Sequence, residues 1–379
     1  MESESSCHPS LRVAMFNISM SDCESEKILA LTANPNITRL RRLAAIIQHA
    51  APDVILLCEF DHLGAGGDDG ALANFCDNYL SVAQYEQHPI EYPYRLCPAT
   101  NTGLLTGIDL NNDGIISLPA DGMGFGHFHG NFGFVLLSKY PIQDNNIRSW
   151  QHMLWNNLPN TLIPRDFYSA ESVNLLRLSS KNHLVIPIQL EQQVINLVCC
   201  HPTPPVFDGP ERRNAKRNHD EIQLICDILD DAAYLKDDNG NTGGLKREQS
   251  FIVLGDLNAD VIDGDGLKVP IKQLLNHTRI NQQVSHGPLT PKSMGGSEYR
   301  PWQRRKGRKG RSNEWTHLGG MRLDYVLPSS NLTVLKSGVF WPEKGHPLRQ
   351  LILDDKGREK PLAGSDHRLV WVDIASYSV

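Results

Sequence analysis

Short apolar runs separated by turn residues recur along most of the chain, a pattern typical of β-strands. The runs are rich in Val, Ile and Leu, which favour strands over helices at these lengths. They predict strands at 11–19, 54–59, 132–138, 183–190, 194–201, 251–255, 323–328, 332–337 and 368–374.

Two segments show helical spacing instead. Residues 38–50 place one set of side chains on an apolar face and a second set on the opposite, basic face. The apolar set is Leu40, Leu43, Ala44, Ile46 and Ile47, and the basic set is Arg39, Arg41 and Arg42. We expect Asn36 to cap this helix and Pro52 to mark its exit. Residues 220–231 repeat the pattern in a second helix.

The order of these elements predicts an α/β fold. Helices alternate with strands early, whereas 183–201 and 323–337 look like hairpin pairs, so mixed sheets with helices on their outer faces are expected. Two long irregular insertions, 61–131 and 281–320, are rich in Gly with Asp and Asn or with Arg and Lys. We expect residues 1–10 to be a flexible N-terminus and 11–379 to form one domain.

Composition agrees with a globular protein, since 40% of the 379 residues are hydrophobic and 21% are charged. The formal net charge of −6 gives no indication of an anionic partner. Arg300–Arg311 is an exception, because this run is strongly basic, lacks acidic residues and contains Trp302. Its basic side chains can bind the backbone of DNA or RNA while Trp302 stacks on a base. Alternatively, the run can be a disordered tether.

The compartment is left open by the sequence. No apolar run approaches the roughly 20 residues of a membrane span, and the first ten residues are polar. One or two disulfides among Cys7, Cys23, Cys76 and Cys97 would fit a secreted protein. We expect a secreted or periplasmic monomer rather than a cytoplasmic one.

The strongest chemical signal is a set of polar residues placed at the ends of apolar runs. Burying a carboxylate costs several kcal/mol unless a cation or hydrogen bonds compensate. Here four acids occur in such places, accompanied by Asn and His residues. The acids are Glu59, Asp256, Asp324 and Asp366, and their companions are Asn17, Asn258, His201 and His367. Oxygen ligands with few nitrogens predict a Mg²⁺, Mn²⁺ or Ca²⁺ site rather than a zinc site.

Single positions in this set have ordinary alternatives. Asn17 can be a turn residue, and Asp324 can pair with Arg322 on the surface. His201, followed by Pro202, can be a simple loop histidine. P-loop, HExxH and G-x-S-x-G motifs are missing, which disfavours P-loop proteins, zincins and serine hydrolases.

Three motifs in order give the chain a family resemblance: Gly255-Asp256-Leu257-Asn258-Ala259, Arg322-Leu323-Asp324-Tyr325 and Ser365-Asp366-His367. The chain resembles the endonuclease/exonuclease/phosphatase superfamily from about residue 11 to residue 374. That superfamily includes pancreatic deoxyribonuclease, abasic-site endonucleases, bacterial sphingomyelinases and inositol polyphosphate phosphatases. The resemblance implies a four-layer α/β sandwich, two mixed β-sheets packed face to face and flanked by helices.

The resemblance also implies roles for the residues. Glu59 is similar to the principal metal-binding carboxylate, with Asn17 and Asp366 as further metal-site residues. Asp256 and Asn258 resemble the pair that orients the attacking water and contacts the scissile phosphate. His367 resembles a catalytic imidazole hydrogen-bonded by Asp324. His201 resembles the second histidine of the deoxyribonuclease and sphingomyelinase branches, which argues against abasic-site repair.

These residues predict a divalent-metal-dependent phosphoester hydrolase using Mg²⁺ or Mn²⁺, most closely a nuclease-like phosphodiesterase. One alternative is a phosphomonoesterase acting on small phosphate esters or lipid head groups. Another is a binding protein that kept the scaffold without catalysis.

Two secondary sites are also predicted. Asp109, Asn111 and Asp113 have the opening spacing of an EF-hand loop, so with Ile115 and Asp121 they are candidates for a structural Ca²⁺ site. An Asx-rich turn is the alternative.

Near the catalytic strands, four polar residues are candidates for contacting substrate, because cationic and amide side chains suit phosphate. They are Lys181, His183, Asn214 and Arg217.

Overall fold

The computed structural model describes residues 10–191, 193–300, 307–360 and 363–375. Its strands form two mixed sheets. The first consists of β1 (Ser10–Met20), β2 (Val54–Phe60), β3 (Tyr94–Leu96), β4 (Phe134–Ser138), β10 (Val334–Val339) and β11 (Val370–Ala375). The second consists of β5 (Arg148–Ser149), β6 (His183–Gln189), β7 (Val194–Cys200), β8 (Phe251–Asp256) and β9 (Asp324–Pro328). Their orders are β10-β11-β1-β2-β4-β3 and β5-β6-β7-β8-β9.

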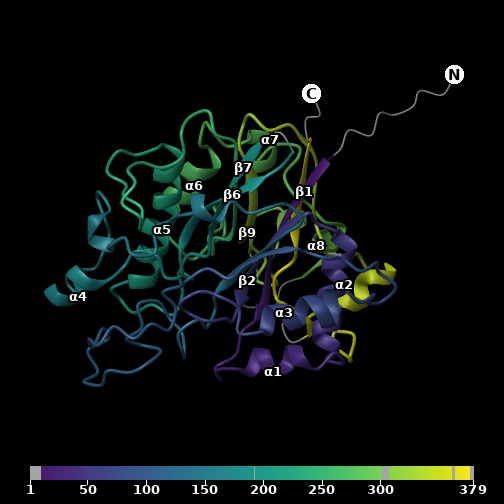
Figure 1. The fold of residues 1–379 in the computed structure, drawn as a ribbon, viewed down its shortest axis with the longest axis horizontal. Coiled ribbons are helices and arrows are strands. Elements are labelled where there is room, and N and C mark those ends of the chain that lie inside the picture. The colour runs from purple at the N-terminus through teal and green to yellow at the C-terminus, as the bar shows by residue number, and fades with distance from the viewer. Residues whose placement is uncertain (1–9, 192, 301–306, 361–362, 376–379) are drawn as a thin grey trace.

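Helices lie outside the two sheets (Figure 1). The α-helices are α1 (Lys27–Ala33), α2 (Thr38–Ala50), α3 (Ala71–Phe75), α4 (Ala170–Leu175), α5 (Arg213–Leu229), α6 (Val269–Leu275), α7 (Gln282–Ser285) and α8 (Met294–Glu298). Shorter 3-10 turns are Asp144–Asn146, Trp155–Asn157, Ser312–Glu314 and Pro347–Ile352, and Cys76–Leu80 is a π-helical turn. Among the described residues, no helix is long and apolar enough to cross a bilayer.

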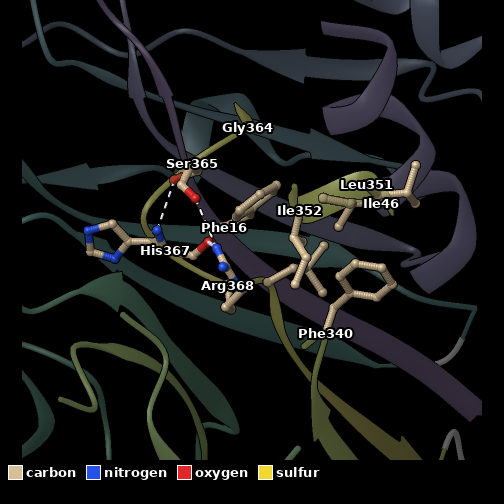
Figure 2. Close-up of a pocket in the computed structure, with 10 residues that line it drawn as sticks. Phe16, Ile46, Phe340, Leu351, Ile352, Gly364, Ser365, His367 and Arg368 are labelled. Atoms are coloured by element: carbon tan, nitrogen blue, oxygen red, sulfur yellow. Dashed lines mark hydrogen bonds between the residues drawn. The ribbon is translucent and has the colours of Figure 1, made fainter. Parts of the chain in front are cut away.

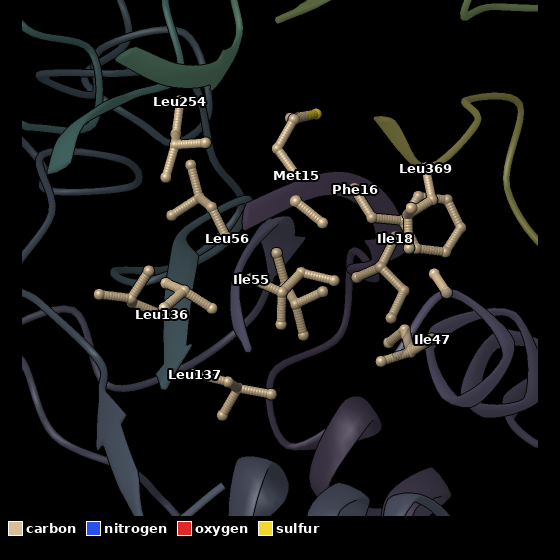
Figure 3. Packing of buried hydrophobic residues seen from close by; sticks show 14 of the residues in the cluster. Met15, Phe16, Ile18, Ile47, Ile55, Leu56, Leu136, Leu137, Leu254 and Leu369 are labelled. Carbon is tan, nitrogen blue, oxygen red and sulfur yellow. The ribbon is translucent and has the colours of Figure 1, made fainter. Parts of the chain in front are cut away.

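Two apolar clusters account for the four layers predicted from the resemblance. One cluster fills the space between the sheets and continues under α2, joining Leu56 of β2, Leu254 of β8 and Ile47 of α2. The other joins the outer face of the second sheet to α5 and α6. Figure 3 shows Leu56 directed toward Leu254, with Leu369 packed near Phe16. Because side chains alternate across each strand, one set of strand residues serves each interface.

The strand assignments are confirmed with small shifts at their ends, but one pairing is wrong. Residues 183–201 form the expected antiparallel pair of β6 and β7. Residues 323–337 do not form a hairpin, because β9 pairs with β8 in one sheet and β10 pairs with β11 in the other. The turn between them therefore carries the chain from one sheet to the other.

Both predicted helices exist, and α2 has the predicted bounds, whereas α5 starts earlier than predicted. Helix α5 begins at Arg213 rather than at 220, because the Asp208 carboxylate accepts hydrogen bonds from the backbone N–H groups of Asn214 and Ala215. This carboxylate caps a polar first turn that apolar spacing cannot reveal. Helix α2 is preceded by Ile37 and has no side-chain cap, so Asn36 does not fill that role.

The two insertions are packed rather than irregular throughout. Residues 61–131 contain α3, the π-helical turn and β3, and residues 281–320 contain α7, α8 and a 3-10 turn. The described cysteines are all free thiols, and most are buried. Cys23, Cys76 and Cys97 therefore form no disulfide among themselves, and Cys7 lies outside the described residues.

Replacing Leu56 with Ala should lower the free energy of unfolding by about 2–5 kcal/mol, because it empties volume between the two sheets. Urea denaturation followed by circular dichroism measures this change. The matched control is Leu335→Ala on β10, where the side chain is 39% exposed. That control should shift stability by less than about 0.5 kcal/mol. Equal losses in both variants would contradict the described core.

Candidate active site

The polar residues that end the central strands meet at one edge of the sandwich. Strand β1 runs parallel to β2, and β7 runs parallel to β8, so Asn17, Glu59, His201 and Asp256 lie at or just beyond the carboxyl ends of their strands. Strands β9 and β11 run antiparallel to these neighbours and therefore start at the same edge. This places Asp324 directly opposite Asp256 in the pairing of β8 and β9.

The Asn17 amide connects the acids of the two sheets. Its Nδ2 donates to Glu59 Oε1 at 3.1 Å and to Asp256 Oδ2 at 2.9 Å, and its Oδ1 accepts the backbone N–H of Ser19 at 3.1 Å. Burial raises the pKa of both Glu59 and Asp256, and the charges of neighbouring acids raise it further. Asn17 thus bridges two buried carboxylates rather than only shaping a turn.

His367 is held by a chain of side chains that starts on a different segment. Its Nδ1 lies 2.9 Å from Asp324 Oδ2, and that oxygen accepts the Thr316 hydroxyl at 2.6 Å. Burial alone would lower the pKa of His367, but the Asp324 and Asp256 carboxylates raise it well above its usual value. These carboxylates therefore favour the protonated form of the ring. Asp324 does not pair with Arg322, whose guanidinium donates to the Ser285 carbonyl.

The turn that carries His367 is fixed to β1. Ser365 Oγ donates to the Asn17 carbonyl at 2.7 Å and accepts the His367 backbone N–H at 3.0 Å. Figure 2 shows the His367 ring directed away from the apolar side chains of Phe16, Ile352 and Phe340. The same residue, Asn17, thus orients the acids through its side chain and the Ser-Asp-His turn through its backbone.

His201 has a different environment. It is only 2% exposed, and neither ring nitrogen has a hydrogen-bond partner among the described residues. Burial lowers its pKa well below the usual value, and the charges of Lys181 and His367 lower it further. Its Nε2 lies 3.6 Å from Asp256 Oδ2, the distance at which His367 Nε2 also lies from that oxygen. Two imidazoles whose pKa values are shifted in opposite directions therefore flank one carboxylate.

Three residues at these strand ends adopt left-handed backbone conformations: Ser19 (φ 53°), Glu59 (φ 56°) and Asn258 (φ 50°). Non-glycine residues adopt this region only at a cost of roughly 1–3 kcal/mol, and such strain clusters at functional sites. Two hydrogen bonds hold Asn258 in this conformation. Its backbone N–H donates to Asp256 Oδ1 at 2.9 Å, and its Nδ2 donates to the Pro202 carbonyl at 3.1 Å.

The donor set fits a hard divalent cation. Within the described residues, two overlapping trios bring their ligand atoms within 4.8 Å of one another: Asp256, Asp324 and His367, and Asp366, His317 and His367. Glu59 joins them through its bond to Asn17. The donors are mainly carboxylate oxygens, and a cation would offset the burial penalty that raises the pKa of Glu59 and Asp256.

Lys181 is the one proposed substrate contact that lies beside these acids. Its side chain is buried, and burial lowers its pKa, while the charges of Glu221, Glu59 and Asp256 act in the opposite direction. These charge interactions place Lys181 in the same cluster as Glu59 and Asp256.

The other three proposed substrate contacts use polar atoms for hydrogen bonds within the fold, and their role as substrate contacts stays a prediction. Arg217 donates to the carbonyls of Leu178 at 2.9 Å and of Met123 and Arg177 at 2.7 Å. His183 is buried between Ser179 Oγ and the Glu221 carbonyl. Asn214 Nδ2 donates to the Val206 carbonyl at the start of α5.

The proposed calcium loop has the contacts of Asx turns. The oxygens of Asp109 accept backbone N–H groups of Asp113 and Gly114, and Asp113 accepts that of Ile115. Asp121 uses both oxygens for the backbone N–H groups of Leu110 and Ser117. Asn111 Nδ2 donates to Asp113 Oδ2. Within the described chain these acids form no trio of converging ligand atoms, and the calcium site stays a prediction.

The basic run Arg300–Arg311 is described only in part, because 301–306, including Trp302, lie outside the described residues. Beyond that gap, Arg308 donates to the Asp263 carbonyl, and the backbone N–H of Lys309 donates to the Asp263 carboxylate. These contacts anchor the end of the run to the loop after β8.

Three residues near the site were not predicted as site residues. Arg39 was expected on the outer face of α2, but its Nε donates to the Gly364 carbonyl at 2.9 Å. Burial lowers the pKa of Arg39, and the charges of Asp366 and Glu59 act in the opposite direction. Thr316 supports Asp324, and His317 contacts Asp366. Helical spacing could not identify Arg39, because residues at the start of a helix can reach past its end. Thr316 and His317 lie in a segment without periodicity.

The chain matches a known protein family and is similar to several solved structures. Residues 16–367 match the Endonuclease/Exonuclease/phosphatase family. Among solved structures, an endonuclease/exonuclease/phosphatase from Beutenbergia cavernae is 16% identical with a TM-score of 0.52, covering 97% of this chain and 71% of that one. No curated protein matches the chain.

Two further solved structures are similar at lower scores. Sphingomyelinase C from Streptomyces griseocarneus and a beta toxin mutant from Staphylococcus aureus with bound magnesium ions are each 15% identical with TM-scores of 0.46. Each comparison covers 97% of this chain and 100% of the other.

Replacing Arg217 with Ala should lower the free energy of unfolding by about 3 kcal/mol, because it leaves carbonyls without their donor. KM for any substrate should change little. Chemical denaturation and steady-state kinetics measure the two effects. Lys216→Ala, one residue earlier on α5, is the matched control and should leave stability nearly unchanged. A raised KM at unchanged stability would return Arg217 to the substrate site.

Proposed function

The chain belongs to the endonuclease/exonuclease/phosphatase family, and from this premise we propose that it is a divalent-metal-dependent phosphoester hydrolase acting as a nuclease-like phosphodiesterase. One observation carries the proposal: the Asn17 amide joins Glu59 to Asp256, and the imidazoles of His201 and His367 flank Asp256. An acid cluster with a neutral and a protonated imidazole is suited to water attack on phosphorus.

The cation would be held by Glu59 and Asp366, with Asn17 orienting the first of these carboxylates. When bound, Mg²⁺ or Mn²⁺ neutralises phosphate charge and stabilises the leaving oxygen. The remaining contributions come from the side chains of the protein.

The two histidines are assigned different proton-transfer roles. The lowered pKa of His201 favours its neutral form, and its ring nitrogens have no hydrogen-bond partner among the residues that the structure describes, so it can accept a proton from the attacking water. His367 is protonated and its Nδ1–H is engaged by Asp324, which leaves Nε2–H directed toward the site. His367 therefore donates the proton that the leaving oxygen requires.

Substrate phosphate is bound by Lys181 and Asn258. The buried ammonium of Lys181 lies among carboxylates, and an anionic phosphate oxygen offers it a further partner. The backbone N–H of Asn258 donates to Asp256 Oδ1, which holds this residue beside the acid, and its Nδ2 donates to the Pro202 carbonyl. The second N–H of the same amide can donate to a phosphate oxygen.

We propose a diester rather than a monoester as the substrate. A phosphomonoesterase is the second candidate, and a binding protein without catalysis is a third. We propose DNA or RNA as the partner on the basis of the Arg300–Arg311 sequence, with the protein acting as a monomer.

Hydrolysis of bis-(p-nitrophenyl) phosphate should be lost in EDTA and restored by excess Mg²⁺ or Mn²⁺, because the acid cluster needs a cation. Release of p-nitrophenol measures this, with the p-nitrophenyl monoester and supercoiled plasmid as parallel substrates. Faster turnover of the monoester would favour the phosphatase instead. Activity that persists at full rate in EDTA would contradict metal dependence.

Replacing His367 with Gln should slow hydrolysis of a diester with a poor alkyl leaving group by about 10²–10⁴-fold, since an unassisted alkoxide leaves slowly. The p-nitrophenyl diester should lose much less, because its leaving group needs no proton. His201→Gln is the matched comparison, and it should slow both substrates to a similar extent. The opposite pattern would exchange the two assignments.

A further inference from the structure

One short segment contacts both residues of the Asp366-His367 pair. The backbone N–H of Leu318 donates to the Asp366 carbonyl at 2.9 Å, and that of Arg368 donates to the Thr316 carbonyl at 2.7 Å. His317 forms an isolated β-bridge with His367, and their ring centroids are 4.6 Å apart. Residues 316–318 therefore run beside the catalytic turn in a fixed register.

Successive side chains of this segment support different residues. Thr316 bonds to Asp324, which in turn bonds to His367, whereas His317 Nε2 lies 3.3 Å from Asp366 Oδ2. The first contact fixes the imidazole. The second acts on the carboxylate that we assign to the cation.

The hydrogen bond at Nδ1 of His317 shows whether Nε2 donates a hydrogen bond to Asp366. Nδ1 lies 2.9 Å from the backbone nitrogen of Gly319, and a backbone N–H can only donate. Nδ1 must therefore carry a lone pair, so the proton of the neutral ring resides on Nε2. His317 consequently donates to Asp366 and has no lone pair to offer a metal from that nitrogen. A metal-bound histidine has the reverse pattern, with its second nitrogen donating.

We propose that His317 is a positioning residue that orients the Asp366 carboxylate for the divalent cation without binding the cation itself. This inference rests on the proposed function, because it assigns a supporting role at the same metal site. Asp366 Oδ1 accepts no side-chain hydrogen bond within the described residues, so that oxygen is available to a cation. A lysine or arginine in place of His317 would neutralise Asp366, whereas a neutral N–H orients it and preserves its charge.

Amide side chains distinguish orientation from simple packing. The amide nitrogen of Gln reaches the position of histidine Nε2, whereas that of Asn reaches only the position of Nδ1. His317→Gln therefore retains the donor to Asp366, and His317→Asn and His317→Ala remove it.

The experiment is equilibrium Mn²⁺ binding to the full chain, followed by the electron paramagnetic resonance signal of free Mn²⁺. His317→Ala and His317→Asn should raise the dissociation constant about 10–100-fold, the usual effect of losing such a supporting contact. His317→Gln should stay within about threefold of the unsubstituted protein. Thermal unfolding without metal shows whether each variant is folded.

The outcomes separate two failures. If the Ala variant binds Mn²⁺ as tightly as the unsubstituted protein, or if Gln is as damaging as Ala in folded proteins, the positioning role is overturned alone. If the unsubstituted protein binds neither Mn²⁺ nor Mg²⁺, the metal-dependent function itself is overturned, and the inference with it.

Discussion

The site depends on one hydrogen-bonded amide, the side chain of Asn17, which donates to carboxylates from both sheets. Burying Glu59 and Asp256 together is unfavourable, as the raised pKa of each shows. Asn17 offsets part of that cost. Its backbone carbonyl also accepts a hydrogen bond from Ser365, which holds the turn that contains Asp366 and His367. The face-to-face packing of two sheets is what allows a β1 side chain to reach the end of β8. Fold and chemistry are therefore coupled at this residue.

Environment, rather than residue type, gives the two histidines different properties. His367 lies among carboxylates and is bonded to Asp324, and these contacts raise its pKa despite burial. Burial lowers the pKa of His201, whose ring nitrogens have no hydrogen-bond partner in the described part of the chain, and nearby cationic groups lower it further. Groups whose pKa values are separated in this way can exchange protons with a reacting phosphate in opposite directions. The strained conformations at Ser19, Glu59 and Asn258 indicate that the surrounding packing maintains this arrangement at some cost to stability.

Sequence patterns predicted the strands and the residues at their ends, because apolar runs report burial and polar residues at their limits are conspicuous. Family resemblance, not spacing, supplied the pairing of Asp324 with His367. Patterns failed where a long-range partner decides the outcome. Arg217 has the appearance of a phosphate ligand but donates to three backbone carbonyls, and β9 and β10 are adjacent in sequence yet lie in different sheets. His317 was missed because its function depends on Gly319 and Asp366, which no local pattern connects.

The most direct test of the account is a crystal structure of the protein grown with Mn²⁺, with anomalous differences recorded near the manganese absorption edge. The account predicts an anomalous peak beside Glu59 and Asp366 at the edge shared by the two sheets. Carboxylate oxygens should lie at coordination distance, and the His317 ring should be turned toward Asp366. A fully active protein whose only bound manganese lies away from these acids would contradict the account.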